Sequence, residues 1–195
     1  MGSPQGRSPR PVRLFRVLDY DANAGVEAPG GAKYVPPQGS GRLDNPEAYE
    51  ILYTCRQAAG AIAERFRRGP YLHRWHANML RPPIYAPSSA RALVTYDLPG
   101  SARICDLDDG KALADRAIRP SRVVSVDYSV TQAWALSIHG EGRWSGIGWW
   151  SRMDSRWANV AVWNVAELIV LDIEPLRLDL PALVEAAGVL DIEIT

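Results

Sequence analysis

The sequence contains little cysteine. Only Cys55 and Cys105 occur among its 195 residues, far from each other in the chain and outside any metal-type spacing. Secreted domains that depend on disulfides carry more cysteines, so this composition favours a reducing compartment and we expect a cytoplasmic protein. His73 and His76 lie three residues apart, but no cysteine or carboxylate is close to them in sequence. We therefore expect no metal site.

Net charge and long apolar runs are absent as well. Lys and Arg together number 22, as do Asp and Glu, so no overall basic field exists to attract a polyanion. We expect no direct binding of nucleic acid. No apolar run approaches the roughly 18 residues needed to span a bilayer, and none follows the N-terminal arginines as in a signal peptide. We expect no membrane association.

Common catalytic motifs are also missing. The sequence has no GxSxG elbow, no P-loop, no GxGxxG motif after a strand and no HExxH. A catalytic site in this chain must therefore be assembled from residues that lie far apart in the sequence.

The length suits a single domain that can bury a core of its own. Residues 1–12, rich in Gly, Ser, Pro and Arg, are expected to form a flexible tail, and residues 13–195 the domain. Apolar periodicity predicts roughly six to eight short strands and about four short helices in irregular order. That order indicates an α+β fold with a mixed central sheet, and not a doubly wound sheet.

The elements expected from periodicity are separated by two long loops, at 19–46 and 69–90, and long loops of this kind are often binding loops. Strands are expected at 14–17, 51–54, 93–97, 103–107, 146–151, 160–163, 168–173 and 190–194. Helices are expected at 57–66, 108–117, 129–139 and 181–187. Asp108 should cap the second helix, Ser129 and Gln132 should form a capping box on the third, and Pro181 and Gly188 should bracket the last.

A candidate binding loop is Gly39-Ser40-Gly41-Arg42. The two glycines let the backbone approach a ligand closely, and the guanidinium of Arg42 can hold a phosphate or carboxylate through two hydrogen bonds. The alternative is an ordinary surface arginine in a glycine-rich loop.

Glu64 is a second candidate. On the helix expected at 57–66 it shares a face with the small residues Gly60 and Ala61, which leave room for a ligand to approach the carboxylate. The alternative is a glutamate at the boundary of the core that forms weak exposed ion pairs with neighbouring arginines such as Arg65.

The remaining candidates lie on expected strands. Trp149 and Ser151 point to the same side of the strand at 146–151. A hydroxyl on an apolar face needs a hydrogen-bond partner from the protein or from a ligand, and Trp149 serves either the core or a binding surface. Tyr53 precedes the Glu64 helix, and its ring could stack on a flat heteroaromatic ligand.

Taken in order, these segments resemble the RES domain family, which is named for its arginine, glutamate and serine and includes the toxins of RES–Xre toxin–antitoxin pairs. The matching segments are Leu14-Phe15-Arg16, Gly41-Arg42-Leu43-Asp44-Asn45-Pro46, Leu52-Tyr53, Ala61-Ile62-Ala63-Glu64, Trp144-Ser145-Gly146-Ile147 and Trp149-Trp150-Ser151. The resemblance extends from residue 14 to about residue 173. Leu43 stands where many members have a tryptophan, and the segment after residue 173 matches no family pattern.

The resemblance implies an ADP-ribosyltransferase-like fold and an enzyme that cleaves the nicotinamide–ribose bond of NAD by phosphorolysis or hydrolysis, as a toxin. NAD would be a substrate and no cofactor is expected. Expected partners are NAD, phosphate, an Xre-type helix-turn-helix antitoxin and a second copy of the chain. The expected catalytic residues are Glu64, Arg42 and Ser151, and the expected NAD-binding residues are Tyr53, Arg42, Arg16 and Trp149.

The chemistry assigns each of these residues a task. Nicotinamide in NAD is already a cationic leaving group, so cleavage develops positive charge on the ribose, which the Glu64 carboxylate would stabilise. Arg42 would bind the diphosphate, Tyr53 would stack on nicotinamide, and Ser151 would hold the ribose or the amide. Two alternatives stay open: transfer of ADP-ribose to a protein, and a non-catalytic module that binds a nucleotide or a partner.

Overall fold

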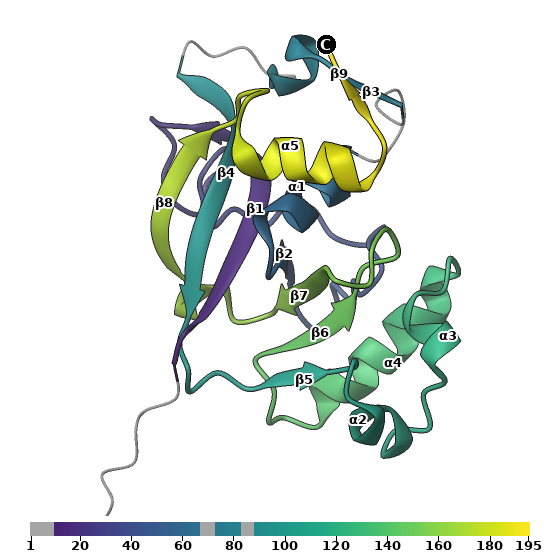
Figure 1. Cartoon of the computed structure of the whole chain (residues 1–195). Helices are drawn as coiled ribbons and strands as arrows, with labels where there is room; N and C mark the ends of the chain where they lie inside the picture. The colour runs from purple at the N-terminus through teal and green to yellow at the C-terminus, as the bar shows by residue number, and fades with distance from the viewer. Residues whose placement is uncertain (1–9, 67–72, 83–87) are drawn as a thin grey trace, which may run out of the picture.

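The central feature of the structure is a seven-stranded sheet in the order β5-β6-β7-β2-β1-β4-β8 (Figure 1). The structure is a computed structural model that describes residues 10–66, 73–82 and 88–195. The sheet strands are β1 (Val12–Asp21), β2 (Leu52–Cys55), β4 (Ser89–Leu98), β5 (Ile104–Asp106), β6 (Gly146–Trp150), β7 (Ala158–Val162) and β8 (Ile169–Pro175). Strands β5 and β6 are parallel, whereas the other neighbouring strands are antiparallel. The expected α+β fold with a mixed central sheet is confirmed.

The α-helices form two groups (Figure 1). In the first group, α1 (Ala58–Phe66) and α5 (Pro181–Val189) pack against each other, and α1 also contacts β1 and β2. In the second group, α2 (Gly110–Ala114), α3 (Pro120–Val123) and α4 (Tyr128–Gly140) lie beside β5 and β6. Two short 3-10 helices, η2 (Ala77–Leu80) and η3 (Val165–Glu167), and a parallel ribbon of β3 (Arg74–Trp75) with β9 (Glu193–Ile194) complete the described part.

Each helix group closes its own part of the core. The apolar stripe of α1, which comprises Ala59, Ile62, Ala63 and Phe66, is fully buried and packs in one cluster with α5. On α4, Trp134 and Ile138 are buried in a second cluster with β6, whereas Val130, which helical spacing also predicts to be buried, is only partly buried. Because α1 is fixed through its apolar stripe, the orientation of its neighbouring polar face is fixed too.

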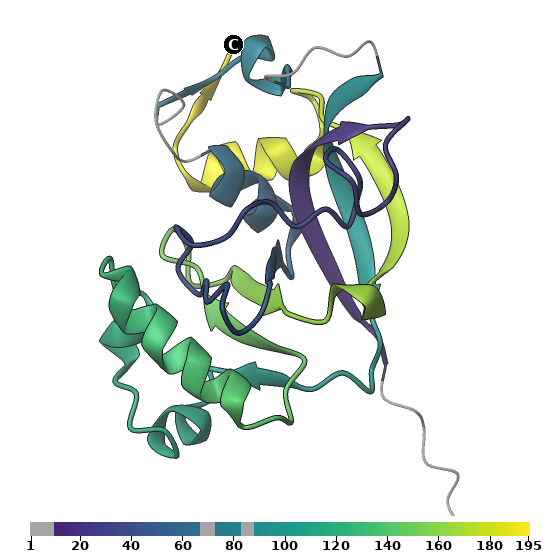
Figure 2. The same cartoon turned by 180° about the vertical axis from the view of Figure 1, so that it is seen from behind.

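The longest strand pair joins β1 to β4 over ten residues each, from Val12 opposite Leu98 to Asp21 opposite Ser89. Both strands are longer than the sequence pattern predicted, because the backbones stay paired beyond the apolar residues, as far as the polar end at Asp21 and Ser89. Residues 1–9 of the predicted tail lie outside the described residues, and β1 already begins at Val12. Figure 2 shows the long segment between β1 and β2 crossing the side of the molecule that faces away in Figure 1.

Three predicted helix boundaries are wrong. Helix α2 is capped by Asp109, whose side chain accepts a hydrogen bond from the Lys111 amide, and not by Asp108. Helix α4 is capped by Asp127, so Ser129 lies within the first turn and the predicted capping box does not form. In both cases an aspartate near the predicted position competes successfully for the cap.

The third wrong boundary is at the end of α5. Gly188 lies inside this helix, which continues to Val189, and the chain turns only at Asp191, where φ is +53°.

The loop predicted at 69–90 contains β3 and η2 and ends where β4 begins at Ser89. Residues 69–72 and 83–87 of this loop lie outside the described residues.

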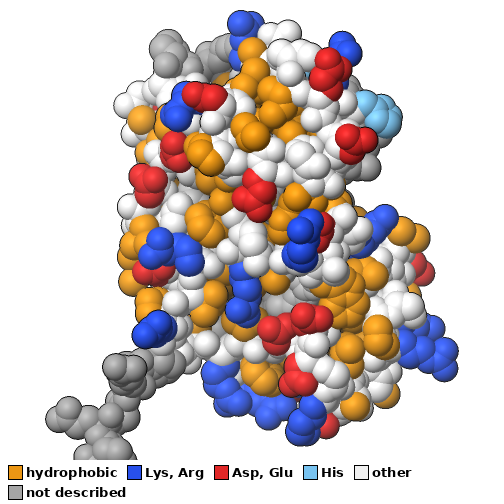
Figure 3. Space-filling view, viewed as in Figure 1, with side chains coloured by type: hydrophobic (Ala, Val, Ile, Leu, Met, Phe, Trp, Pro, Cys, Tyr) orange, Lys and Arg blue, Asp and Glu red, His pale blue; other side chains and the backbone are white. Residues whose placement is uncertain are grey.

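Both cysteines are buried and unpaired. None of the helices among the residues described is long and apolar enough to cross a membrane. On the face shown in Figure 3, acidic and basic side chains are interspersed over most of the surface, as their equal numbers in the sequence lead one to expect.

Candidate active site

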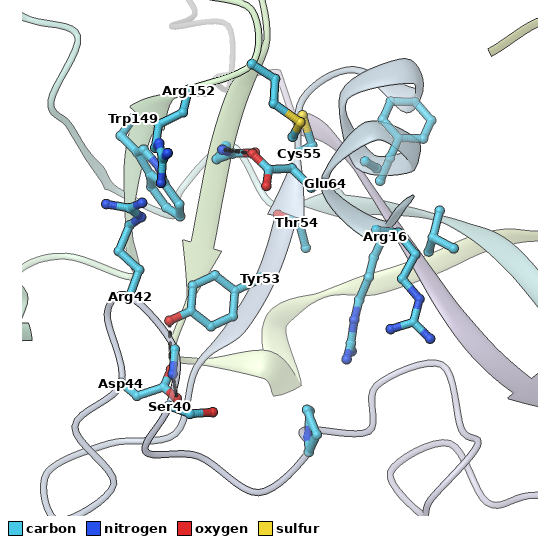
Figure 4. A pocket seen from close by; sticks show the side chains of 18 of the residues that line it. Arg16, Ser40, Arg42, Asp44, Tyr53, Thr54, Cys55, Glu64, Trp149 and Arg152 are labelled. Atoms are coloured by element: carbon cyan, nitrogen blue, oxygen red, sulfur yellow. Dashed lines mark hydrogen bonds between the residues drawn. The ribbon is translucent and has the colours of Figure 1, made fainter. Parts of the chain in front are cut away.

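A cavity of about 830 Å³ lies between the β1–β2 segment, strands β2, β6 and β7, and helix α1. Its volume is in the range of pockets that enclose whole small-molecule ligands. Five of the six predicted site residues line it: Arg16, Arg42, Tyr53, Glu64 and Trp149. Figure 4 shows Glu64 near the middle of the cavity wall, with Arg42 and Arg152 on one side and Arg16 on the other.

The Glu64 carboxylate is held by two neutral donors. The Ser151 hydroxyl and the Asn159 amide each donate a hydrogen bond to Oε1 of Glu64, both at 2.9 Å. Within the described parts of the chain, Oε2 accepts no hydrogen bond and the carboxylate forms no ion pair. Arg65, one of the neighbouring arginines considered as an ion-pair partner of Glu64, pairs instead with Asp19, at 2.9 Å. Arg67 and Arg68 lie outside the described residues.

Ser151 lies behind Glu64 and does not line the cavity. Its side chain is buried, its hydroxyl proton is directed to Glu64, and its oxygen accepts a hydrogen bond from the Met153 amide at 3.1 Å. The serine hydroxyl on the apolar face thus finds protein partners. It contacts the cavity only through the carboxylate that it holds.

Arg42 is fixed by the segment between α3 and α4. Its Nη1 donates to the carbonyl of Ser125 at 2.6 Å and to that of Val123 at 3.4 Å, and its guanidinium lies over the Tyr128 ring at 5.1 Å. Burial, and then the charge of Arg152, lowers the pKa of Arg42. The guanidinium is therefore held in one orientation in a partly desolvated position.

Asp44 shapes the glycine-rich loop that carries Arg42. Its carboxylate accepts hydrogen bonds from the amides of Gly39 and Gly41, at 2.8 and 2.7 Å, and from the Tyr53 hydroxyl at 2.7 Å. A Cβ at residue 41 would overlap this carboxylate, so the close approach requires glycine.

Tyr53 and Trp149 form an aromatic corner of the cavity. The Tyr53 hydroxyl also accepts a hydrogen bond from the Leu43 amide, at 2.8 Å, and its ring meets the Trp149 ring edge to face at a centroid distance of 6.4 Å. Burial and the hydrogen bond to Asp44 raise the pKa of Tyr53, so the phenol stays neutral. Trp149 is part of a core cluster and also lines the cavity, so one residue belongs both to the core and to the cavity wall.

Arg16 lies on the opposite side of the cavity from Arg42 (Figure 4). Its Nη1 donates to the carbonyl of Tyr34 at 2.8 Å, and burial lowers its pKa. Arg65, which also lines the cavity, has its charge compensated by Asp19. The cavity is therefore cationic on both sides of Glu64.

Among the cavity residues that the sequence did not predict, Asn159 and Arg152 lie nearest to the predicted set: Asn159 donates to Glu64, and Arg152 follows Ser151. Asn159 is the one polar residue in the strand Ala158–Val162, whose other members are Ala and Val. A buried amide needs hydrogen-bond partners, so this pattern could have indicated that Asn159 binds another polar group. Arg152 directly follows Ser151 in an irregular segment and carried no such signal.

The arrangement lacks a thiol nucleophile but offers a fixed carboxylate. Cys55 also lines the cavity, and burial raises its pKa to about 12, so its thiol is neutral near pH 7 and unreactive. Glu64 combines a fixed position with an oxygen that is free to face a ligand. Such a site can stabilise positive charge that develops next to the carboxylate.

Comparisons with known proteins agree with this fold. The toxin chain of the M. tuberculosis MbcT–MbcA toxin–antitoxin complex has a TM-score of 0.60 and 16% sequence identity to this chain, over 87% of this chain and 86% of that chain. At this identity the likeness concerns the fold. No curated protein matches. The family model of the RES domain matches residues 10–181, a range that includes all six predicted site residues. The chain therefore belongs to the RES domain family.

Proposed function

We propose that this protein is an NAD-degrading enzyme that cleaves the nicotinamide–ribose bond, and that it is the toxin of a toxin–antitoxin pair. The observation that carries the proposal is the state of Glu64. Two neutral groups hold one oxygen of its carboxylate, and the other oxygen is free in a cavity with cationic sides. Membership of the RES domain family supports the same activity.

The reaction needs no acid to release the leaving group. When the N-glycosidic bond breaks, its electron pair goes to the pyridinium nitrogen, and nicotinamide leaves as a neutral molecule. Positive charge then develops on the ribose, as in glycoside hydrolysis. We propose that Oε2 of Glu64 stabilises this charge, because Oε1 is occupied by Ser151 and Asn159.

The other site residues bind and orient the dinucleotide. Arg42 binds the diphosphate, and the corner formed by Tyr53 and Trp149 receives the flat nicotinamide ring. Ser151 acts through Glu64 and not by direct contact with the ribose, since its proton is already donated to the carboxylate. Arg16 supplies positive charge to the opposite side of the cavity.

Phosphate and water are both suitable acceptors for the ribosyl cation. The arginines that line the cavity favour entry of an anion such as phosphate. Each product has a different mass: hydrolysis gives ADP-ribose, phosphorolysis gives its 1″-phosphate, and transfer to a protein gives an adduct.

The proposal is tested by incubating purified protein with NAD, with and without phosphate, and identifying the products by mass spectrometry. We expect free nicotinamide together with ADP-ribose or its 1″-phosphate. Glu64→Gln should reduce nicotinamide release on the order of 10²-fold or more. Tight binding of NAD without any nicotinamide release would contradict the enzymatic proposal and favour a binding module.

The toxin role is supported by the likeness to a chain from a toxin–antitoxin complex. We propose that an Xre-type helix-turn-helix antitoxin covers the cavity and blocks access of NAD. Expression of the wild-type chain alone should arrest growth and deplete cellular NAD, whereas Glu64→Gln should do neither at the same protein level. Growth arrest by both proteins would show that toxicity does not depend on the carboxylate of Glu64.

A further inference from the structure

We propose that Arg152 joins Arg42 to form a diphosphate subsite, in which a fixed guanidinium and a free one bind the same anion. The inference rests on the proposed function for the identity of the ligand and adds Arg152 as a binding residue. Both side chains line the cavity and lie on the same side of it, next to Trp149 (Figure 4).

Arg42 supplies the fixed half of this subsite. Both of its hydrogen bonds to backbone carbonyls use Nη1. Over the stretches that the structure describes, Nε and Nη2 donate no hydrogen bond, so two N–H-bearing groups of an already oriented fork remain available. A guanidinium in this state binds phosphoryl oxygens without first having to be ordered.

Arg152 supplies the free half. Among the described residues its side chain has no hydrogen-bond or ion-pair partner, although the backbone on both sides of it is held. The Ser151 amide donates to the carbonyl of Trp157 at 2.7 Å, and the Met153 amide donates to the Ser151 hydroxyl at 3.1 Å. An anchored backbone with a free guanidinium lets the side chain close over a bound anion.

The charges also favour an anion at this position. Arg42 and Arg152 form no ion pair with a carboxylate in the described regions, whereas Arg65 on the other side is paired with Asp19. Besides burial, the charge of Arg152 lowers the pKa of Arg42, and the charge of Glu64 raises it by less, so this carboxylate does not fully offset the repulsion between the two guanidiniums. A diphosphate reduces this repulsion because it carries two negative charges. The free pair is therefore a better diphosphate site than the paired arginine.

Direct binding measurements test this subsite independently of catalysis. We would titrate wild type, Arg152→Gln and Arg156→Gln with inorganic pyrophosphate and with ADP-ribose in a calorimeter. Arg156 is the matched control, because it lies four residues further along and already pairs with Asp154 at 2.6 Å. Arg152→Gln should weaken both ligands roughly 10-fold, the effect of losing one charged hydrogen bond, while Arg156→Gln should bind them like wild type.

A ligand without phosphate distinguishes a loss of binding at this subsite from a general loss of binding in the cavity. Binding of nicotinamide riboside should be the same in wild type and Arg152→Gln. The melting temperatures should agree, because the Arg152 side chain has no hydrogen-bond or ion-pair partner in the described part of the chain. Wild-type pyrophosphate affinity in Arg152→Gln, or an equal loss for nicotinamide riboside, would overturn the subsite. A protein that binds pyrophosphate through Arg152 but releases no nicotinamide from NAD would keep the subsite and reject the proposed enzymatic function.

Discussion

Two glutamates of this protein accept several hydrogen bonds each, but from donors of different charge. Glu141 is bound by Arg116 through both carboxylate oxygens, at 2.7 and 2.8 Å, by Arg143 at 2.9 Å, and by the Trp144 indole at 2.7 Å. These contacts, the hydrogen bonds from Arg116 foremost, lower the pKa of Glu141 to about 2. Among the described residues, Glu64 is held only by a hydroxyl and an amide.

The difference separates a structural carboxylate from the one that we propose to act in catalysis. The charge of Glu141 is cancelled by its arginines, so its contribution is to tie α2 and α4 to the Trp144 segment. The charge of Glu64 is fixed in place but not cancelled by an ion pair with any residue described. A carboxylate in this state can stabilise a cationic ribose without reorganising during the reaction.

Among changes that leave the Glu64 carboxylate in place, the largest effect is expected from removing its two neutral donors. Ser151→Ala and Asn159→Leu should each lower kcat for NAD cleavage about 10-fold, and the double variant about 100-fold, because each removes one hydrogen bond to a charged group. KM should change less than kcat, since the carboxylate acts mainly in the transition state.

The matched control for Asn159 is Asn164. Its amide also donates to a glutamate, Glu167, at 2.7 Å, but on the exposed surface. Asn164→Leu should leave kcat unchanged. If Asn159→Leu reduced kcat no more than Asn164→Leu, or acted only on KM, the role assigned to Asn159 in fixing Glu64 would be wrong.

A smaller effect, on stability, is expected at Glu141. Its pKa is lowered in the folded state from an ordinary value of 4.5 to about 2, so its stabilising contribution is complete above the unfolded pKa and is lost as the pH falls from about 4.5 to about 2. Glu141→Gln should cost about 1 kcal/mol at neutral pH, or roughly 2–4 °C in melting temperature, since the carboxylate is partly exposed.

Thermal melting as a function of pH checks this expectation. The difference in melting temperature between wild type and Glu141→Gln should shrink as the pH falls through that window. A difference that stays constant down to pH values near 2 would show that the ionised carboxylate is not its source.

The smallest effect is expected for a third carboxylate, Asp115, which pairs with Lys111 on the surface of α2 at 2.8 Å. The two side chains are 55% and 78% exposed. Lys111→Ala should therefore lower the melting temperature by clearly less than Glu141→Gln does, and the change should vanish in high salt. A loss as large as that of Glu141→Gln would mean that exposure does not separate these ion pairs.

The parts of the site that sequence could predict were those carried by regular elements. The apolar stripe of α1 fixed which residues face the core, and Glu64 follows from it by helical spacing. Strand alternation likewise placed Trp149 and Ser151 on one side of β6 and its continuation. Periodicity alone does not predict that Arg42 lies near these segments. That prediction came from the family resemblance.

The parts that sequence could not predict depend on contacts between distant segments. The backbone carbonyls that orient Arg42 belong to a turn more than eighty residues away. The proton of Ser151 is donated to Glu64 instead of a ligand because α1 packs beside the end of β6, which no local pattern specifies. The caps were misplaced for a local reason, since Asp108 and Asp109 are adjacent and equally suited to the role.

The most direct test of the contrast between the two glutamates is a crossed measurement on Glu64→Gln and Glu141→Gln, with nicotinamide release from NAD and melting temperature recorded for both. We predict that Glu64→Gln loses cleavage on the order of 10²-fold while keeping the wild-type melting temperature or exceeding it, and that Glu141→Gln melts earlier but cleaves NAD like wild type. Wild-type cleavage by Glu64→Gln, or an equal loss of cleavage in both variants, would contradict the role of an unpaired, fixed carboxylate at the centre of this site.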